Sequence, residues 1–195
     1  MSEVSQNYSH IFVETFEASR EVKSRLAESE FAVLNEIANQ CLRSLRGGNK
    51  IILFGNGGSA ADSQHIAAEL VSKFTQNRKA LRAIALTTDT SILTSVANDF
   101  AFEEVFARQV EALGNAGDTA LAISTSGQSA NIIKAVRMAK EMGLATVGFT
   151  GKNGGKLVEY VDLCFRVPSQ NTARIQEVHI TAAHALCDIL EKELG

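Results

Sequence analysis

The chain of 195 residues has one proline, no tryptophan and only three cysteines. Pro168 stands near the end, and no stretch rich in Ser, Gly and Pro suggests a linker, so we expect a single domain covering residues 1–195. The cysteines, Cys41, Cys164 and Cys187, lie far apart without metal-ligand spacing. Each falls in an apolar periodic segment, which predicts reduced thiols packed as small hydrophobic groups.

Long apolar runs and a surplus of one charge are also missing. Charged residues make up 21% of the chain and the formal net charge is -3, so nothing predicts a nucleic-acid surface. No run approaches the roughly 18 apolar residues that a membrane span requires. The start, MSEVSQNYSHIF, lacks the pattern of an export signal. We therefore expect a cytoplasmic protein, with no nucleic acid and no membrane as partner, that binds a small ligand or another protein.

Apolar residues recur at helical spacing in the first quarter of the chain. Residues from about 29 to 46 place Leu34, Ile37 and Cys41 on one face, and the glycine pair that follows is a helix stop. A weaker pattern of the same kind covers residues from about 8 to 26. We expect residues 1–48 to form an N-terminal helical arm that is used in oligomerisation.

Short apolar runs alternate with helix-like segments after residue 50. The runs are KIILF, AIAL, TALAIS, ATVGFT and DLCFRV. Continuous apolar strands that alternate with helices indicate a parallel sheet covered on both faces. For residues 49–195 we expect an α/β core with a doubly wound, flavodoxin-like sheet of five parallel strands, closed by a helix over about 172–193. In such sheets the ligand lies at the carboxyl ends of the strands, where the strand order reverses.

The loop after the first run, Gly55–Gly58, is rich in glycine. Glycine lets the backbone approach a ligand closely and adopt positive φ. Ser59 and Asp62 have the spacing of a capping box, which predicts a helix start beside the loop and favours an anionic or hydroxyl-rich ligand. The letters GNGGSA also fit the loose dinucleotide fingerprint, but the candidate ribose partner, Asp89, stands too far along the chain.

Hydroxyl groups crowd the loop after TALAI. The sequence STSGQS runs into a periodic helix, and its hydroxyls together with the amides of a helix start offer many neutral donors to a phosphate group. The phosphate-binding candidates are Ser124, Thr125, Ser126 and Ser129. A second glycine cluster, TGKNGGK at 150–156, lacks the first glycine and the final hydroxyl residue of a P-loop, so we interpret it as a turn.

Two helical segments carry groups suited to proton transfer or metal binding. His65 and Glu69 are four residues apart, so they share a helix face and could meet one metal ion or substrate, although a solvated pair is the plain alternative. Gln176 and His184 are about 80° apart around the last helix and about 12 Å apart along it, so they border one cavity only if they lean together. His179 is an equal candidate on chemical grounds, and a packing role would also explain it.

Five segments in fixed order resemble the phosphoheptose isomerases of the sugar isomerase (SIS) domain superfamily. They are FGNGGSAADSQHIAAEL, LTTDTS, VANDF, ISTSGQSANIIKA and ARIQEVHITAAH, and the resemblance covers nearly the whole chain. It implies a ketose-aldose isomerase that converts sedoheptulose 7-phosphate to D-glycero-D-manno-heptose 7-phosphate through an enediol. That product enters bacterial heptose biosynthesis for lipopolysaccharide or other surface glycans.

The resemblance also implies roles for individual residues. It makes Glu69 and His184 the acid/base pair. It places one zinc ion per subunit between His65, Glu69, Gln176 and His184, in a homotetramer with sites near subunit contacts. It puts the substrate contacts at Asn56, Gly57, Gly58, Glu69, Asn98, Asp99, Ser124, Thr125, Ser126, Ser129 and Gln176.

Two positions depart from the isomerase pattern. Lys73 stands where an arginine is usual, so a bidentate contact to an oxyanion would become a single-point contact. Ala173 stands where an acidic residue is frequent. A relative that binds the replication initiator DnaA shares the fold and the ARIQE run but lacks the acid/base pair, which gives a non-catalytic alternative. The presence of both Glu69 and His184 favours the enzyme.

Overall fold

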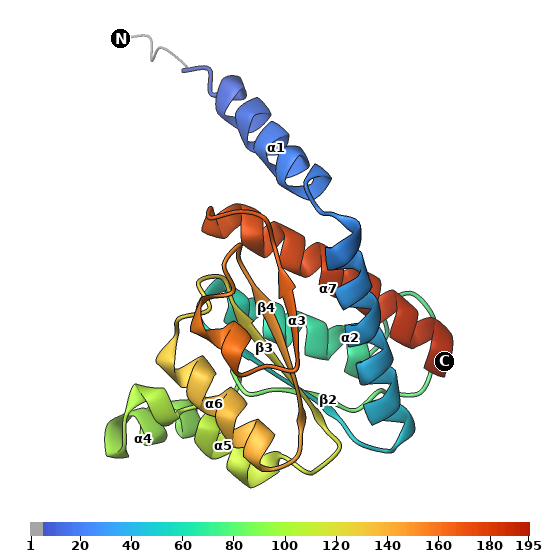
Figure 1. Ribbon diagram of the computed structural model, residues 1–195, viewed down its shortest axis with the longest axis vertical. Helices are drawn as coiled ribbons and strands as arrows, with labels where there is room; N and C mark the ends of the chain where they lie inside the picture. Colours follow the sequence, from blue (N-terminus) through green and yellow to red (C-terminus); the bar gives the residue numbers. More distant parts are fainter. Residues whose placement is uncertain (1–5) are drawn as a thin grey trace.

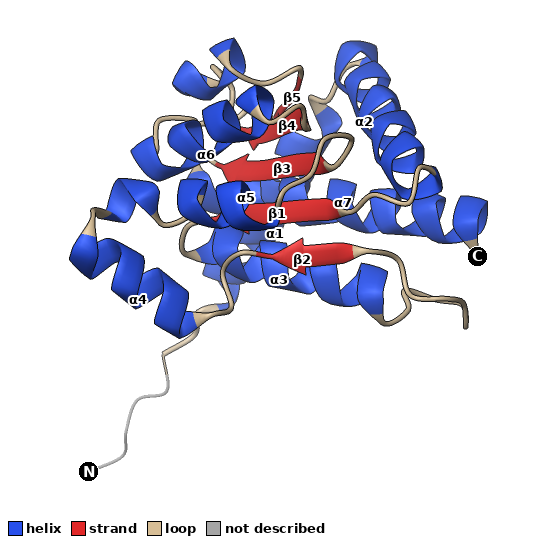
Figure 2. Cartoon of the chain, turned by 90° about the horizontal axis from the view of Figure 1, so that it is seen from below, coloured by secondary structure: helices blue, strands red, loops and turns tan. Residues whose placement is uncertain are grey.

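The computed structural model describes residues 6–195, which form one sheet with helices on both faces (Figure 1, Figure 2). The strands are β1 (Ile51–Gly55), β2 (Ala83–Ala85), β3 (Thr119–Ser124), β4 (Ala145–Thr150) and β5 (Leu163–Arg166). All neighbouring strands are parallel, in the order β2-β1-β3-β4-β5. This is the flavodoxin-like order, so the predicted fold is confirmed.

Seven α-helices connect and cover these strands within the described part of the chain. They are α1 (Ser9–Ser24), α2 (Glu28–Arg46), α3 (Gly58–Val71), α4 (Thr90–Asp99), α5 (Ala107–Leu113), α6 (Ala130–Glu141) and α7 (Thr172–Leu194). Two short 3-10 helices, η1 (Phe102–Glu104) and η2 (Gly155–Glu159), complete the set. The helices predicted from the periodicity near both ends of the chain lie within two residues of α1, α2 and α7.

Successive side chains of the central strands enter two separate cores. In β1, Ile51 and Leu53 pack towards α2, α3 and α7, whereas Ile52 and Phe54 pack towards α5 and α6. All four side chains are buried. The strands therefore read as continuous apolar runs, because neither face of the sheet meets water.

The helix α1 extends away from this body (Figure 1). Its side chains Ile11, Phe12, Val13 and Phe16 are 49–74% exposed. The next helix, α2, packs on α7 and β5 and buries Ile37. No helix within residues 6–195 is both long and apolar enough to cross a bilayer.

The predicted capping box at the start of α3 is wrong. The cap residue is Gly57, at φ +56°, and no side chain caps the helix. Ser59 already lies inside the first turn and is buried, so its hydroxyl is not at the cap position. The carboxyl group of Asp62 is half-buried instead, and its Oδ2 has no hydrogen-bond partner among the described residues. Burial raises the pKa of Asp62, while the charges of His65 and His184 oppose that rise.

The three cysteines are free thiols, as the sequence predicts. Cys41 and Cys187 are buried between α2 and α7, and burial raises the pKa of each thiol to about 12. Burial also raises the pKa of Cys164, in β5. All three groups therefore stay protonated near neutral pH and act as packing residues.

His179 is a core residue. Its ring lies 5.6 Å from the Phe149 ring and 6.3 Å from the Phe165 ring, between centroids. Its Nε2 donates to the Thr150 carbonyl at 3.1 Å, and its Nδ1 is buried without a partner in residues 6–195. Burial lowers the pKa of His179 to about 4. Of the histidine alternatives on α7, His179 therefore has the packing role.

This burial makes the stability of the fold depend on pH. Between pH about 6.5 and about 4 the unfolded His179 takes up a proton that the folded residue does not, so the free energy of unfolding falls as the pH falls. Above this range the imidazole is neutral in both states and the contribution is fully present. We expect a loss on the order of 3 kcal/mol across the range, measured by urea unfolding at several pH values.

The variant His179→Leu should show a flatter profile over this range, whereas His10→Gln, at an exposed histidine, should follow the wild type. Equal slopes for the wild type and His179→Leu would contradict the assignment.

Candidate active site

A polar pocket lies where the strand order of the sheet reverses. The chain leaves β1 towards β2 on one side and leaves β3 towards β4 on the other, so the loops after β1 and β3 separate and open a crevice. The pocket has a volume of about 280 Å³. Its lining includes eight predicted site residues, namely Asn56, Gly57, Gly58, Ser124, Thr125, Ser126, Ser129 and Gln176.

The hydroxyl loop after β3 is organised by its own backbone. Ser124 Oγ accepts from the Gly127 amide at 3.2 Å, and Ser126 Oγ accepts from the Gln128 amide at 3.2 Å. A hydroxyl that accepts from an amide still has its own hydrogen to donate. Ser129 is the cap residue of α6 and makes no side-chain cap bond. The loop therefore presents O–H donors, together with the start of α6, to an anion such as a phosphate.

Asn56 joins the two sides of the crevice. Its side-chain amide and that of Asn131, on α6, exchange two hydrogen bonds of 2.9 Å each. Asn131 is buried, and its Oδ1 also accepts from the Ile132 amide at 3.0 Å. Sequence reasoning missed Asn131, because nothing local to the NIIKA segment indicates a partner in a distant loop.

Gln176, on α7, closes another side of the pocket next to Gly58. A Cβ atom at Gly58 would overlap the Gln176 amide group. The glycine therefore provides the space that the Gln176 side chain occupies. It also brings the N-terminal ends of α3 and α7 together at the pocket.

Three predicted catalytic and metal-binding residues meet between α3 and α7. His65 Nε2 lies 3.2 Å from Glu69 Oε1 and 3.5 Å from His184 Nε2. The two imidazole rings meet edge to face, with centroids 5.0 Å apart, and Phe74 packs on His184. The His65 side chain is 46% exposed and that of Glu69 is 24% exposed, so the cluster faces solvent. The structure thus brings together the carboxylate and the imidazole that the sequence places far apart.

The donor set fits zinc in its chemistry, and two of its pair distances also fit. Two imidazole nitrogens and a carboxylate oxygen are common zinc ligands, and with bonds near 2.0 Å they would sit about 3.3 Å apart around a tetrahedral ion. The two distances from His65 Nε2, 3.2 and 3.5 Å, agree with this separation between ligand atoms. However, no three His, Cys, Asp or Glu side chains among residues 6–195 form a group that could hold a metal as they stand. Gln176, the fourth predicted ligand, lines the pocket instead.

Asn98 and Asp99 lie apart from the pocket. They end α4, their side chains are exposed, and Asn98 Nδ2 donates to Asp99 Oδ1 at 2.7 Å. Neither side chain lines the polar pocket formed within one chain. The helix α4 lies beyond the ends to which the strand arrows point (Figure 2). Asp89, the weak ribose candidate, caps α4 by accepting from the Ile92 amide at 3.0 Å.

A buried ion pair lies beyond the His–Glu cluster. Arg78 Nε is 3.2 Å from Glu191 Oε1, and both side chains are almost wholly buried. The guanidinium also donates to the Glu69 and Leu70 carbonyls at 2.8 Å each. Burial raises the pKa of Glu191, but bonds from the Thr75 hydroxyl and from three backbone amides outweigh it and hold the pKa at about 2. Sequence reasoning missed this pair, because no spacing pattern connects its members.

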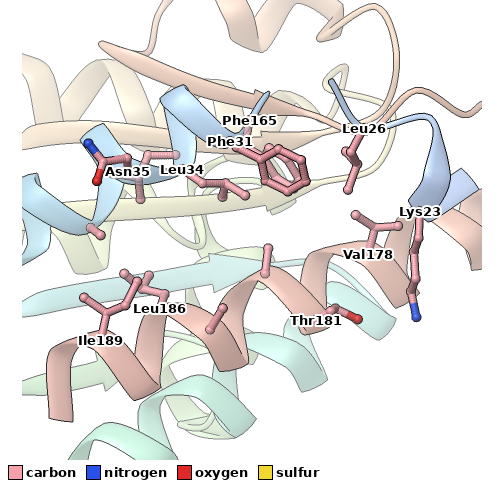
Figure 3. A pocket seen from close by; sticks show the side chains of 14 residues that line it. Lys23, Leu26, Phe31, Leu34, Asn35, Phe165, Val178, Thr181, Leu186 and Ile189 are labelled. Carbon is pink, nitrogen blue, oxygen red and sulfur yellow. The ribbon is translucent and has the colours of Figure 1, made fainter. Parts of the chain in front are cut away.

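A larger apolar groove lies on the other side of α7 (Figure 3). Its volume is about 460 Å³, and Leu26, Phe31, Leu34, Leu186 and Ile189 are among its lining residues. None of the predicted site residues lines it. It is therefore separate from the polar pocket.

Comparisons with known proteins agree with this arrangement. The family profile described as the SIS domain matches residues 15–151. The chain is 56% identical to a phosphoheptose isomerase of Roseiflexus, over 100% of this chain and 98% of that protein. A solved phosphoheptose isomerase from Neisseria gonorrhoeae is 42% identical with a TM-score of 0.88, covering 94% of this chain and 99% of that one. A second, from Francisella tularensis, is 37% identical with a TM-score of 0.91, covering 96% and 100%.

Proposed function

Because this chain belongs to the phosphoheptose isomerases of the SIS domain family, we infer that it converts sedoheptulose 7-phosphate to D-glycero-D-manno-heptose 7-phosphate. The observation that carries this inference is the meeting of Glu69 and His184 at His65, on the two helices that also border the polar pocket. The comparisons give no support to the non-catalytic alternative, a partner of DnaA. We place the reaction in heptose biosynthesis for surface glycans, in the cytoplasm, where phosphorylated sugars are metabolised.

The reaction moves a carbonyl group from C2 to C1. A base must remove a proton from the carbon next to the carbonyl, and an acid must return a proton to the neighbouring carbon of the enediol. We assign the transfer between carbons to Glu69 and the transfer between oxygens to His184. Imidazole suits the second task, because its unperturbed charge change falls near neutral pH. The hydroxyls of Ser124, Thr125, Ser126 and Ser129 hold the phosphate, and Asn56, Gly57, Gly58 and Gln176 contact the sugar.

Removing either proton-transfer group tests this assignment. Glu69→Gln and His184→Gln should each lower turnover of sedoheptulose 7-phosphate by roughly 100-fold or more, the scale of lost acid/base catalysis. Formation of heptose 7-phosphate in purified protein measures the effect. The control variants Glu141→Gln and His10→Gln make the same chemical changes at exposed positions outside the site and should keep wild-type turnover. Unchanged turnover in Glu69→Gln or His184→Gln would remove that residue from the mechanism.

We further propose that His65, Glu69, Gln176 and His184 hold one zinc ion per subunit. The two pair distances around His65 support this set. Bound zinc would act as a Lewis acid that stabilises the enediolate oxygen. A tightly bound carboxylate is a poorer base, so we expect the Glu69 contact with the metal to be loose.

Metal removal tests the zinc proposal. We expect the purified protein to contain one zinc per subunit by elemental analysis, chelation to abolish turnover, and added zinc to restore it. His65→Gln should lower the zinc content, because it removes the donor that lies nearest to the other two. Full turnover by rigorously metal-free protein would refute a catalytic metal.

We also propose a homotetramer in which residues 1–48 form the contact arm of a single domain whose α/β core is 49–195. The arm supports this because α1 exposes an apolar face that water disfavours. The apolar groove beside α7 is an additional surface that another subunit could cover (Figure 3). Asn98 and Asp99 lie outside the pocket of one chain, so their predicted sugar contacts require a site that subunit assembly completes.

Light scattering at micromolar concentration tests the assembly. We expect four subunit masses for the wild type. The double variant Phe12→Glu/Phe16→Glu should form smaller species, since it places charges on the exposed apolar face of α1. Glu14→Gln, on the same helix, should remain tetrameric. A monomeric wild type would contradict the proposal.

A further inference from the structure

The second glycine cluster packs directly on the hydroxyl loop. The Gly151 amide donates to the Thr125 carbonyl at 3.0 Å, and the Leu157 amide donates to the Gly127 carbonyl at 2.9 Å. Gly155 has φ +56°, and a Cβ there would lie 2.5 Å from the Gly127 carbonyl oxygen. The glycines therefore let the two backbones touch. This contact fixes where the rest of the 151–155 loop stands relative to the phosphate donors.

A small cleft lies between the two loops and adjoins the polar pocket. Its volume is about 210 Å³, and it shares Thr125, Ser126 and Thr172 with that pocket. Lys152 lines the cleft, and its backbone amide donates to the Ser169 carbonyl at 3.2 Å. Among all the residues that line the cleft or the pocket, Lys152 has the one charged side chain.

The ammonium group of Lys152 is not engaged elsewhere in the described chain. Lys50, Lys134 and Lys140 each form an ion pair with a carboxylate, whereas Lys152 forms none within residues 6–195. Its side chain is exposed, so the charge stays hydrated until a ligand arrives. A flexible four-carbon stem can carry such a charge across the shared edge of the two hollows.

The polar pocket that contains the hydroxyl loop has no charged side chain among the described residues that line it. Hydroxyls and helix amides carry only partial charges, whereas a phosphate monoester carries about -1.5 to -2 near pH 7. We propose that Lys152 supplies the missing positive charge and pairs with the substrate phosphate from the adjoining cleft. This inference rests on the proposed function and adds a specificity residue to it. Because the phosphate is far from the reacting carbons, Lys152 stabilises the bound substrate and the transition state equally.

Steady-state kinetics on the whole enzyme separate binding from chemistry. Lys152→Met should raise KM for sedoheptulose 7-phosphate roughly 10-fold to 100-fold, the range for losing a charged contact, and should leave kcat within about twofold. Inhibition by inorganic phosphate should weaken by a similar factor. Lys152→Arg, which keeps the charge, should recover most of the affinity. Lys156→Met removes a charge from the same segment but beside a different hollow, and should resemble the wild type.

Two results would overturn the assignment. One is a KM for Lys152→Met within about twofold of the wild type or equal to that of Lys156→Met. The other is a loss of kcat without a change in KM, which would indicate distortion of the loop rather than a lost contact. If the wild type does not turn over sedoheptulose 7-phosphate, the proposed function fails on its own. Calorimetric binding of inorganic phosphate to the wild type and to Lys152→Met then still decides the role of Lys152.

Discussion

The buried ion pair between Arg78 and Glu191 sets the spacing of the two helices on which the site depends. Arg78 binds the last carbonyls of α3, and Glu191, on α7, accepts from the Phe74, Thr75 and Gln76 amides just beyond α3. A buried ion pair adds little net stability over apolar packing, but it fixes one geometry. That geometry is the distance between the helix that carries Glu69 and the helix that carries His184.

The two helices divide the site along their length. Both begin at the polar pocket, since Gly58 opens α3 and Gln176 lies in the second turn of α7. The His–Glu cluster lies further along both helices, and the Arg78–Glu191 pair lies at their far ends. We therefore expect a substrate whose phosphate sits in the hydroxyl loop to extend between the helices towards the proposed proton-transfer groups. In the proposed mechanism, α3 and α7 contact the sugar with their first turns and transfer protons with later turns, so the Arg78–Glu191 pair would align both tasks.

The sequence could predict features that depend on local patterns, but it could not predict features that depend on contacts between distant segments. The strands follow from apolar runs such as KIILF, because a sheet covered on both faces requires them, and the crevice follows from the strand order. Spacing could not separate His179 from His184, since both stand on α7 and only packing against Phe149 and Phe165 buries the first. The capping box failed because Gly57, at positive φ, caps the helix two residues before the predicted cap, Ser59. Asn131 pairs with Asn56 and Arg78 pairs with Glu191, and periodicity does not predict contacts between segments so far apart in the sequence.

The surroundings of α7 relate the proposed assembly to the proposed catalytic role of His184. One side of the helix faces α3 through His184, and another side lines the apolar groove with Val178, Leu186 and Ile189 (Figure 3). Ile189 is still 40% exposed, so a single chain leaves this side of α7 partly uncovered. A neighbouring subunit that filled the groove would hold α7 from the side opposite α3. An imidazole that must stay within reach of a carboxylate gains from such support, because small displacements of a proton-transfer group lower its rate steeply.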